Sequence, residues 1–463
     1  MKKSILLLIL LIGVSVLALF MPAVPGPIVT EGINSGDVAW MLAATALVLL
    51  MTPGLAYFYG GMIDTKNIIS TMLQSFIAMG VISILWIVVG FSLAFGDSIG
   101  GFIGDPRTFF MFNHVLDGKP WSLAPTIPLV LFAFFQLKFA IITPALITGT
   151  FAERIKFKSY ILFLVLFSLL IYAPLAHWTW HPDGFLFKMG VLDFAGGTVV
   201  HMSAGFAALA AAIFLRTKNE VKTAISPANI PFVLLGTGLL WFGWFGFNAG
   251  SALSAGVLAA SAFATTNTAS AAAGLCWVLL DSAKGKKPSA LGFCIGAVVG
   301  LVAITPAAGF VTIPSSIFIG TVASLISNMV VSWKSKTSLA DTLDVFPCHG
   351  VGGLVGMVMT GLLANTAVNA ANTTGNGLLY GEFGLFKVHM IGLAIVIVFT
   401  FVGAFAILKV TNLILPMKVS ESDKKVGQDM TQHGENLYPA GLTLAKEPVP
   451  PVTSYWLNPE KAI

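Results

Sequence analysis

The feature that most constrains the fold of this chain is a series of about eleven long apolar segments separated by short polar loops. A helix of roughly 20 apolar residues crosses the hydrocarbon core of a bilayer, and these segments reach that length. Only 10% of the 463 residues are charged, whereas soluble proteins carry about 25%. Backbone polar groups in lipid must be satisfied within the protein, so the sequence predicts an all-α polytopic membrane protein.

The number of predicted segments implies an internal symmetry. Two halves of five helices, followed by one extra C-terminal helix, would have opposite orientations in the membrane. Such inverted repeats are common in transporters, and their sites lie near the midplane where the halves meet. The predicted segments are 39–61, 68–96, 124–149, 158–178, 193–215, 228–252, 257–281, 288–306, 309–333, 349–366 and 385–415.

Basic residues indicate the orientation, because they are enriched in cytoplasmic loops. With the N-terminus outside, twelve fall in inner loops and four in outer loops or at a span edge. We therefore predict an external N-terminus and an internal C-terminus, and the net charge of +5 needs no nucleic acid as partner. The inner set is Lys66, Arg154, Lys156, Lys158, Arg216, Lys218, Lys222, Lys284, Lys286, Lys287, Lys334 and Lys336, and the outer set is Arg107, Lys119, Lys188 and Lys387.

The two ends of the chain differ from the apolar middle. Two lysines and an apolar run open the sequence, so residues 1–25 are predicted to be a signal peptide, with a retained first helix as the alternative. Residues 36–417 form the predicted transmembrane domain. Residues 418–463 are polar and charged, and we expect a cytoplasmic regulatory tail too short for a catalytic domain.

One pattern places ionisable groups inside apolar segments and occurs twice. Asp193 precedes His201 by eight residues, Asp341 precedes His349 by the same spacing, and a glycine follows each histidine four residues later. An ionisable group at membrane depth costs about 2.5–3.5 kcal/mol on insertion scales, which makes each a functional candidate. We predict that the two halves donate one histidine each to a shared site. The alternatives are two satisfied core histidines and, for Asp193, a helix N-cap.

Aromatic residues at helical spacing form a second pattern. Phe135 and Phe139 are four residues apart and share a helix face. Trp244, Phe247 and Ser251 form one stripe that presents two rings and a hydroxyl. Ordinary helix packing is the alternative for both sets.

Two further residues stand out beside these rings. Trp180 lies in the predicted outer loop, where a tryptophan either anchors the membrane interface or holds a cation on its face. Lys138 lies between Phe135 and Phe139 in sequence but points away from them around the helix, so it need not enter the same cavity.

The sequence does not indicate an enzyme. The spans contain no phosphate loop, paired catalytic carboxylates, nucleophile elbow or cluster of metal ligands. The three cysteines, Cys276, Cys294 and Cys348, lack metal-ligand spacing and are expected to be small packing residues.

Five motifs resemble the ammonium transporters of the Amt/Mep/Rh family, in particular the bacterial Amt type. The resemblance extends from about residue 36 to residue 438. The motifs are FYGG at 58–61, FAER at 151–154, DFAGGTVVH at 193–201, WFGWFGFNAGS at 241–251 and DVFPCHGVGG at 344–353.

The resemblance implies roles for individual residues. Phe139 and Phe247 would form a stacked gate, with Phe135 and Trp244 beside it. His201 and His349 would be twin histidines lining a pore. The outer ammonium site would consist of Trp180, Phe139 and Ser251, supported by Asp193.

The resemblance also implies a homotrimer of eleven-helix subunits in a bacterial inner membrane, acting in nitrogen assimilation without a cofactor. Ammonium would lose its proton, and ammonia would pass the histidines with or without a separate proton relay. A PII-type signalling protein would bind the cytoplasmic face. The alternatives are an ammonium sensor acting through that partner, or transport of another small solute such as methylamine or carbon dioxide.

Four places depart from the family pattern. Lys138 replaces a small or polar residue. Asp64 and Thr65 change the first inner loop, and the residues at 181–183 lengthen an outer loop. Gln428 stands where an apolar residue is usual. The loop and tail changes weaken the expectation of PII regulation and leave the pore residues untouched.

Overall fold

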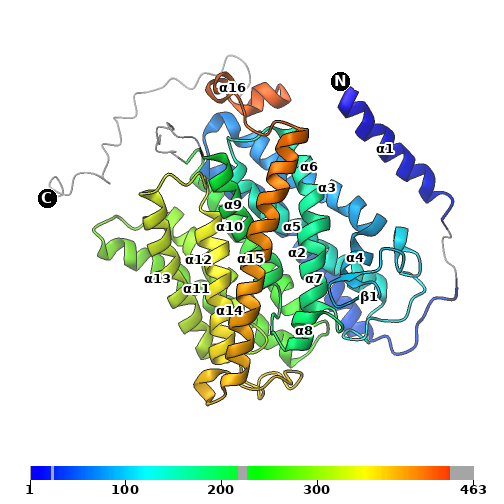
Figure 1. The fold of residues 1–463 in the computed structure, drawn as a ribbon. Coiled ribbons are helices and arrows are strands. Elements are labelled where there is room, and N and C mark those ends of the chain that lie inside the picture. Colours follow the sequence, from blue (N-terminus) through cyan, green and yellow to red (C-terminus); the bar gives the residue numbers. More distant parts are fainter. Residues whose placement is uncertain (1, 22–25, 217–226, 438–463) are drawn as a thin grey trace.

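The computed structural model describes residues 2–21, 26–216 and 227–437, which form a bundle of long helices (Figure 1). The main elements are α2 (Ser35–Met62), α3 (Ile68–Leu85) with η2 (Trp86–Gly90) and α4 (Phe91–Phe95), α5 (Leu129–Phe151), α6 (Phe157–Phe167) with η4 (Ser168–Tyr172) and α7 (Ala173–Trp180), η5 (Gly197–Met202) with α9 (Ser203–Leu215), α10 (Ile230–Gly250), α11 (Val257–Ala283), α12 (Ala290–Ile304), α13 (Ile313–Ser335), η6 (Phe346–Val351) with α14 (Gly352–Leu363), and α15 (Phe383–Ile414). The shorter elements are α1 (Lys2–Ala18), η1 (Thr65–Asn67), β1 (Ser98–Ile99), β2 (Ile103–Gly104), η3 (Phe110–Phe112), α8 (Phe185–Met189), η7 (Leu378–Tyr380), α16 (Glu421–Val426) and η8 (Asp429–His433).

Helices long and apolar enough to cross a membrane are abundant, which confirms a mostly helical membrane architecture, while the count of eleven spans stays a prediction. Ten such segments occur in the described part of the chain. The helix at the eighth predicted segment, α12, has 15 residues and falls below that length. Every predicted segment contains a helix, although the boundaries shift.

Caps and prolines explain the shifted boundaries. The third segment was predicted to begin at residue 124, but α5 begins after Pro128, whose ring cannot donate a backbone hydrogen bond. The ninth was predicted to begin at residue 309, but α13 begins after Thr312, whose hydroxyl accepts from the amide of Ser315. The fourth extends two residues past its predicted end, because α6, η4 and α7 continue one another over Phe157–Trp180, and a turn at 181–184 separates them from α8.

Small residues allow close helix packing, most clearly between α2 and α10. A Cβ atom added at Gly61 would lie 2.6 Å from the carbonyl oxygen of Asn229. One added at Gly54 would lie 2.9 Å from the Cβ of Leu239. Helices in lipid associate through this kind of close van der Waals contact, and the contact holds α2 and α10 side by side around the site described below.

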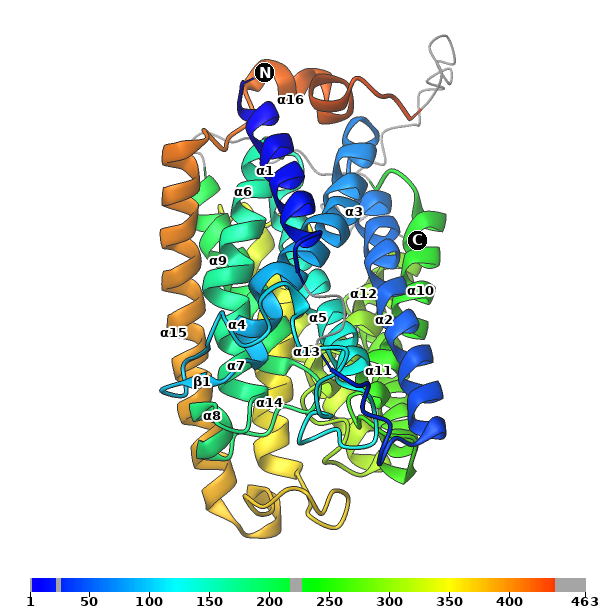
Figure 2. The same cartoon turned by 90° about the vertical axis from the view of Figure 1, so that its right-hand side faces the viewer.

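The two ends of the bundle carry different structures (Figures 1 and 2). One end holds α8 and the antiparallel hairpin of β1 and β2, in which Ser98 pairs with Gly104 and Ile99 with Ile103. The other end holds α16 and η8, the described part of the predicted tail. The first end carries loops predicted to lie outside and the second carries the tail predicted to lie inside, and this orientation stays a prediction.

The tail docks on the bundle through buried polar contacts. The carboxylate of Asp429 accepts hydrogen bonds from the backbone amides of Ile69 and Ser70, at 3.0 and 2.7 Å. The side chain of Gln428 is fully buried and donates to the carbonyl of Ile155. The unusual Gln428 is therefore accommodated by a hydrogen bond. Residues 438–463 of the predicted 418–463 tail lie outside the described part.

The predicted signal peptide contains a helix, α1, which lies beside the bundle in Figure 1. Its described side chains are mostly exposed. Residues 22–25 lie outside the described part, and cleavage of residues 1–25 stays a prediction.

Candidate functional site

Asp193 satisfies the free backbone amides at the start of η5. Its carboxylate accepts hydrogen bonds from the amides of Gly196, Gly197 and Thr198, at 2.6–2.8 Å, and from the Thr198 hydroxyl. The first helical turn leaves these donors without partners. The predicted capping role is therefore confirmed, although the carboxylate reaches the helix from three residues before its Gly196 N-cap.

Asp341 satisfies the free backbone amides at the start of η6 in the same way. Its carboxylate accepts from the amides of Val345 and Phe346, at 3.2 and 2.9 Å, and from the hydroxyl of Thr150 at 2.6 Å. The repeated Asp-x7-His spacing thus encodes one repeated local structure, in which a carboxylate caps a π-helical turn that carries a histidine.

The glycines of the repeat allow the two histidine segments to cross. A Cβ atom added at Gly205 would overlap the backbone of Gly350. One added at Gly353 would lie 3.0 Å from the Cβ of His201. Each glycine therefore packs against the histidine-bearing turn of the other half. A side chain at either position would push the turns apart.

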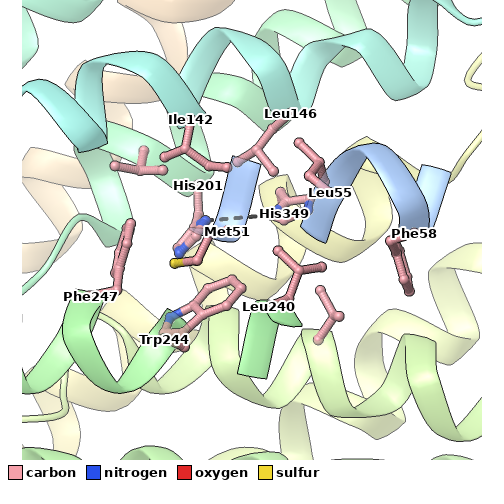
Figure 3. Close-up of a pocket in the computed structure, with 12 residues that line it drawn as sticks. Met51, Leu55, Phe58, Ile142, Leu146, His201, Leu240, Trp244, Phe247 and His349 are labelled. Carbon is pink, nitrogen blue, oxygen red and sulfur yellow. Dashed lines mark hydrogen bonds between the residues drawn. The ribbon is translucent and has the colours of Figure 1, made fainter. Parts of the chain in front are cut away.

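The crossing brings the two histidines together. The Nδ1 atoms of His201 and His349 are 3.4 Å apart, and their ring centroids are 5.5 Å apart (Figure 3). The side chains are 1% and 4% exposed, so both rings lie deep in the bundle.

A row of aromatic rings leads from one side to the histidines. The rings of Phe139 and Phe247 have centroids 4.2 Å apart and lie 33° from parallel. Phe135 contacts Phe139 at 5.0 Å. Trp244 and Phe247 both stack against His201, at 5.4 and 6.0 Å. The predicted gate residues are therefore in mutual contact.

Beyond the Phe139 ring lies a vestibule of about 590 Å³ at the end that holds α8. Trp180, Phe139, Ser251 and Asp193 all line it, so the four residues predicted for the outer site share one cavity. The indole of Trp180 donates to the backbone carbonyl of Asp193 at 3.1 Å and contacts Phe139 edge-on at 5.7 Å. The Ser251 hydroxyl donates to the carbonyl of Phe247.

Past the gate, a narrow cavity surrounds the histidines (Figure 3). Its wall is apolar apart from the two imidazoles and the indole nitrogen of Trp244. A passage of this kind offers a permeating ion almost no polar groups. The lining residues are Met51, Leu55, Phe58, Ile142, Leu146, Val200, His201, Leu240, Trp244, Phe247, Val298 and His349.

Comparison with known proteins identifies this arrangement. The family model described as Ammonium Transporter Family matches residues 39–438. The chain belongs to the ammonium transporter family. It is 45% identical to the ammonium transporter of Bacillus subtilis, over 87% of this chain and 98% of that protein. It is 41% identical to ammonium transporter Amt1 of Archaeoglobus fulgidus, over 88% of this chain and all of that protein.

Solved structures agree with this assignment. Mep2 of Saccharomyces cerevisiae is 34% identical, with a TM-score of 0.79 over 85% of this chain and 89% of that one. A structure titled Sensor Amt Protein is 29% identical, with a TM-score of 0.78 over 86% of this chain and 98% of that one. This family member is therefore a multi-pass membrane transporter and not an enzyme.

A second vestibule of about 180 Å³ shares Phe58 and His349 with the narrow cavity, and Asp344 also lines it. Asp344 pairs with Lys334 at 2.6 Å. Burial raises the pKa of the Asp344 carboxyl to about 6, an effect that Lys334 opposes and Asp341 reinforces. A carboxyl group with this pKa can exchange protons near neutral pH.

Three polar residues that the sequence analysis did not select contact the larger vestibule or the histidine pair. We call the vestibule, the aromatic rings and the narrow cavity together the route. Thr305 accepts a hydrogen bond from the indole of Trp244 at 2.9 Å and lies 3.3 Å from Nε2 of His201. Gln136 and Thr179 line the larger vestibule, each with a buried oxygen that lacks a protein partner. Gln136 sits between two predicted gate rings, which was a usable signal. Thr305 lies in no motif, and only the fold places it beside the histidine.

Lys138 stays outside the route. It lines neither vestibule nor the narrow cavity. Its ammonium group lies over the ring of Phe134, 5.5 Å from the centroid, on its own helix. No group of three His, Cys, Asp or Glu side chains in the described residues could hold a metal ion.

Proposed function

We propose that this family member carries out ammonium transport by binding ammonium at the larger vestibule, removing its proton and conducting ammonia past His201 and His349. The observation that carries the proposal is the buried imidazole pair, 3.4 Å apart, in a narrow apolar cavity. Four residues supply the entry site: Trp180, Phe139, Ser251 and Asp193.

The apolar wall argues against passage of the intact ion. Removing a monovalent ion from water into such a passage costs several kcal/mol even after relaxation. A cation–π contact at the entry contributes only about 0.5–2 kcal/mol. Ammonia is neutral, and a low dielectric favours the neutral form of an ionisable solute. Potassium and sodium cannot lose a proton, so the same wall excludes them.

The hydrogen bonds around the histidines assign their tautomers. The Thr305 hydroxyl donates to the carbonyl of Leu301 at 2.7 Å, so it accepts toward His201. His201 then carries its hydrogen on Nε2, and its Nδ1 accepts from Nδ1–H of His349. Nε2 of His349 is left as a free acceptor. The two N–H donors therefore point in the same direction, from His349 through His201 toward Thr305. The pair can hold ammonia or pass a proton along this line.

We further propose the predicted topology of eleven spans with the N-terminus outside and the tail inside. Backbone bonds join the basic loop around Arg154 and Lys156 to Met417 and Val419 at the start of the tail. This contact supports a position of the tail on the same side as a predicted inner loop. The homotrimer and a PII-type partner at that face are proposed from the family resemblance.

The transported species is tested by electrical recording on a supported membrane containing the purified protein. A current that follows an ammonium gradient and is absent with potassium indicates a proton relay that accompanies ammonia. Uptake of labelled methylammonium without current indicates conduction of ammonia alone. An equal current with potassium would contradict the proposal.

His201→Ala provides the matching mutational test. We expect it to abolish selective ammonium uptake, because the acceptor for the His349 Nδ1–H and one of the two imidazoles that line the narrow cavity are both removed. The measurement is uptake by yeast lacking ammonium transporters, with gel filtration of the variant to establish folding. Unchanged uptake by a folded variant would eliminate the proposed role of the histidine pair.

A further inference from the structure

A third buried histidine, outside the pore, links the last long helix to the entry vestibule. His389 lies on α15 and is fully buried. Its Nδ1 lies 3.0 Å from the carbonyl oxygen of Met357 on α14, and its Nε2 lies 3.1 Å from the backbone nitrogen of Leu192. A carbonyl can only accept and a backbone amide can only donate. His389 is therefore a neutral imidazole with its hydrogen on Nδ1, and both nitrogens are satisfied.

The segment that His389 holds is part of the entry site. Leu192 and Asp193 lie between helices, so regular backbone hydrogen bonds do not fix their position. His389 holds the amide of Leu192, and the indole of Trp180 holds the carbonyl of Asp193 at 3.1 Å. All three of Leu192, Asp193 and Trp180 line the larger vestibule.

The packing of α15 against this segment is close. A Cβ atom added at Gly392, one turn after His389, would lie 2.9 Å from Cγ2 of Val191. One added at Gly361 on α14 would lie 3.3 Å from the Cβ of His389. The imidazole thus sits between α14 and the vestibule segment with no room to turn away.

We propose that His389 is a positioning residue for the entry site. By accepting from Leu192 it holds the 192–193 segment, so that the Asp193 carbonyl orients the Trp180 indole toward the vestibule and the Asp193 carboxylate reaches the amides of η5. His389 touches no substrate and acts through these groups. The inference rests on the proposed ammonium site at Trp180 and adds a residue from the other end of the chain.

Two substitutions of His389 test its two hydrogen bonds separately, the one that it accepts from Leu192 and the one that it donates to Met357. In His389→Gln the amide reaches the position of Nε2, where its oxygen can accept from Leu192. In His389→Asn the amide reaches the position of Nδ1, where its nitrogen can donate to Met357 while Leu192 loses its acceptor. Both variants are polar and smaller than or similar to histidine, so they serve as controls for each other.

The experiment measures ammonium uptake against concentration and hydrogen exchange of the Leu192 amide in the full-length protein. We expect His389→Asn to raise the half-saturating concentration about tenfold at an unchanged maximal rate and to speed exchange at Leu192. His389→Gln should stay close to the parent in both measurements. Equal effects of the two variants, or a loss of maximal rate alone, would overturn the positioning role.

A combination with Trp180→Leu separates this inference from the proposed entry site. If His389 acts through the indole, His389→Asn adds little to the half-saturating concentration of a Trp180→Leu protein. If the two substitutions instead multiply each other's effect on the half-saturating concentration, the proposed action of His389 through Trp180 is overturned. If Trp180→Leu itself leaves the half-saturating concentration unchanged, the proposed entry site fails, while the exchange measurement still decides whether His389 holds Leu192.

Discussion

At the scale of single residues, the capping carboxylates and the paired histidines of this transporter have different kinds of partner. The carboxylates of Asp193 and Asp341 accept from backbone amides and hydroxyls. The imidazoles of His201 and His349 face each other and the narrow cavity. A carboxylate saturated by fixed donors shapes local structure, whereas a histidine with a free acceptor can take part in transport.

Trp180→Leu is expected to raise the half-saturating concentration of ammonium roughly 2- to 30-fold, the range that corresponds to loss of a cation–π contact. The maximal rate should change little, because the contact is made before the rate-limiting part of the passage. Concentration-dependent methylammonium uptake measures both quantities. A variant that fails to reach the membrane would instead assign Trp180 a structural role, since its indole also holds the Asp193 carbonyl.

Thr305→Val tests the tautomer assignment. The substitution removes the acceptor for His201 and for the Trp244 indole while keeping the shape of the side chain. We expect the maximal rate to fall about fivefold, the factor that corresponds to one net hydrogen bond. Thr360→Val is the matched control, because Thr360 is also buried and donates to a carbonyl four residues earlier, away from the histidines. Similar rates for both variants would contradict the assignment.

At the scale of elements, the site depends on two short π-helical turns, η5 and η6, that cross at glycines. The carboxylate cap fixes the start of each turn, and the glycine four residues after the histidine lets the opposite turn approach. The distance between the two imidazoles is thus set by backbone packing. Aromatic contacts at Phe247 and Trp244 then hold the ring of His201 from the side.

Gly205→Ala is expected to lower the thermal stability and to abolish transport. The added methyl would overlap the backbone of Gly350, and overpacking of this kind costs about 1–3 kcal/mol or more. Gly238→Ala is the control, because nothing lies within 4 Å of a Cβ atom there. Thermal unfolding of both proteins in detergent measures the difference. Equal melting temperatures of the two variants would contradict this prediction, because the backbone at Gly205 and Gly350 would then move apart without loss of stability.

At the scale of the whole molecule, segments far apart in sequence meet at both ends of the passage. At one end, His389 of α15 holds the segment before η5. At the other, Asp429 and Gln428 of the tail bind the start of α3 and the loop at Ile155. The C-terminal part of the chain therefore makes polar contacts at both ends of the bundle.

Asp429→Ala is expected to release the tail, because two backbone amides at the start of α3 would lose their acceptor, at a cost of about 1–3 kcal/mol. Limited proteolysis of inside-out vesicles should then cleave the tail faster. Met430→Ala is the control, since that side chain is 43% exposed. Unchanged cleavage would show that the other tail contacts suffice, and protection in right-side-out vesicles tests the proposed orientation.

Sequence alone was sufficient to predict the helical membrane architecture, the repeat of Asp and His, and a shared place for His201 and His349. Apolar segment length and residue spacing are local properties, and they determine which groups lie on one face of a helix. The family motifs added the residues of the outer site and the gate, and the structure brings these residues together.

Only the tertiary structure decided which groups from different helices meet. Thr305 and His389 belong to no motif, and their partners lie on other segments of the chain. The approach of Gly205 to Gly350 and the reach of His389 to Leu192 depend on how helices cross, and local spacing carries no information about that crossing. Sequence therefore determined the parts of the transporter, and helix packing decided their contacts.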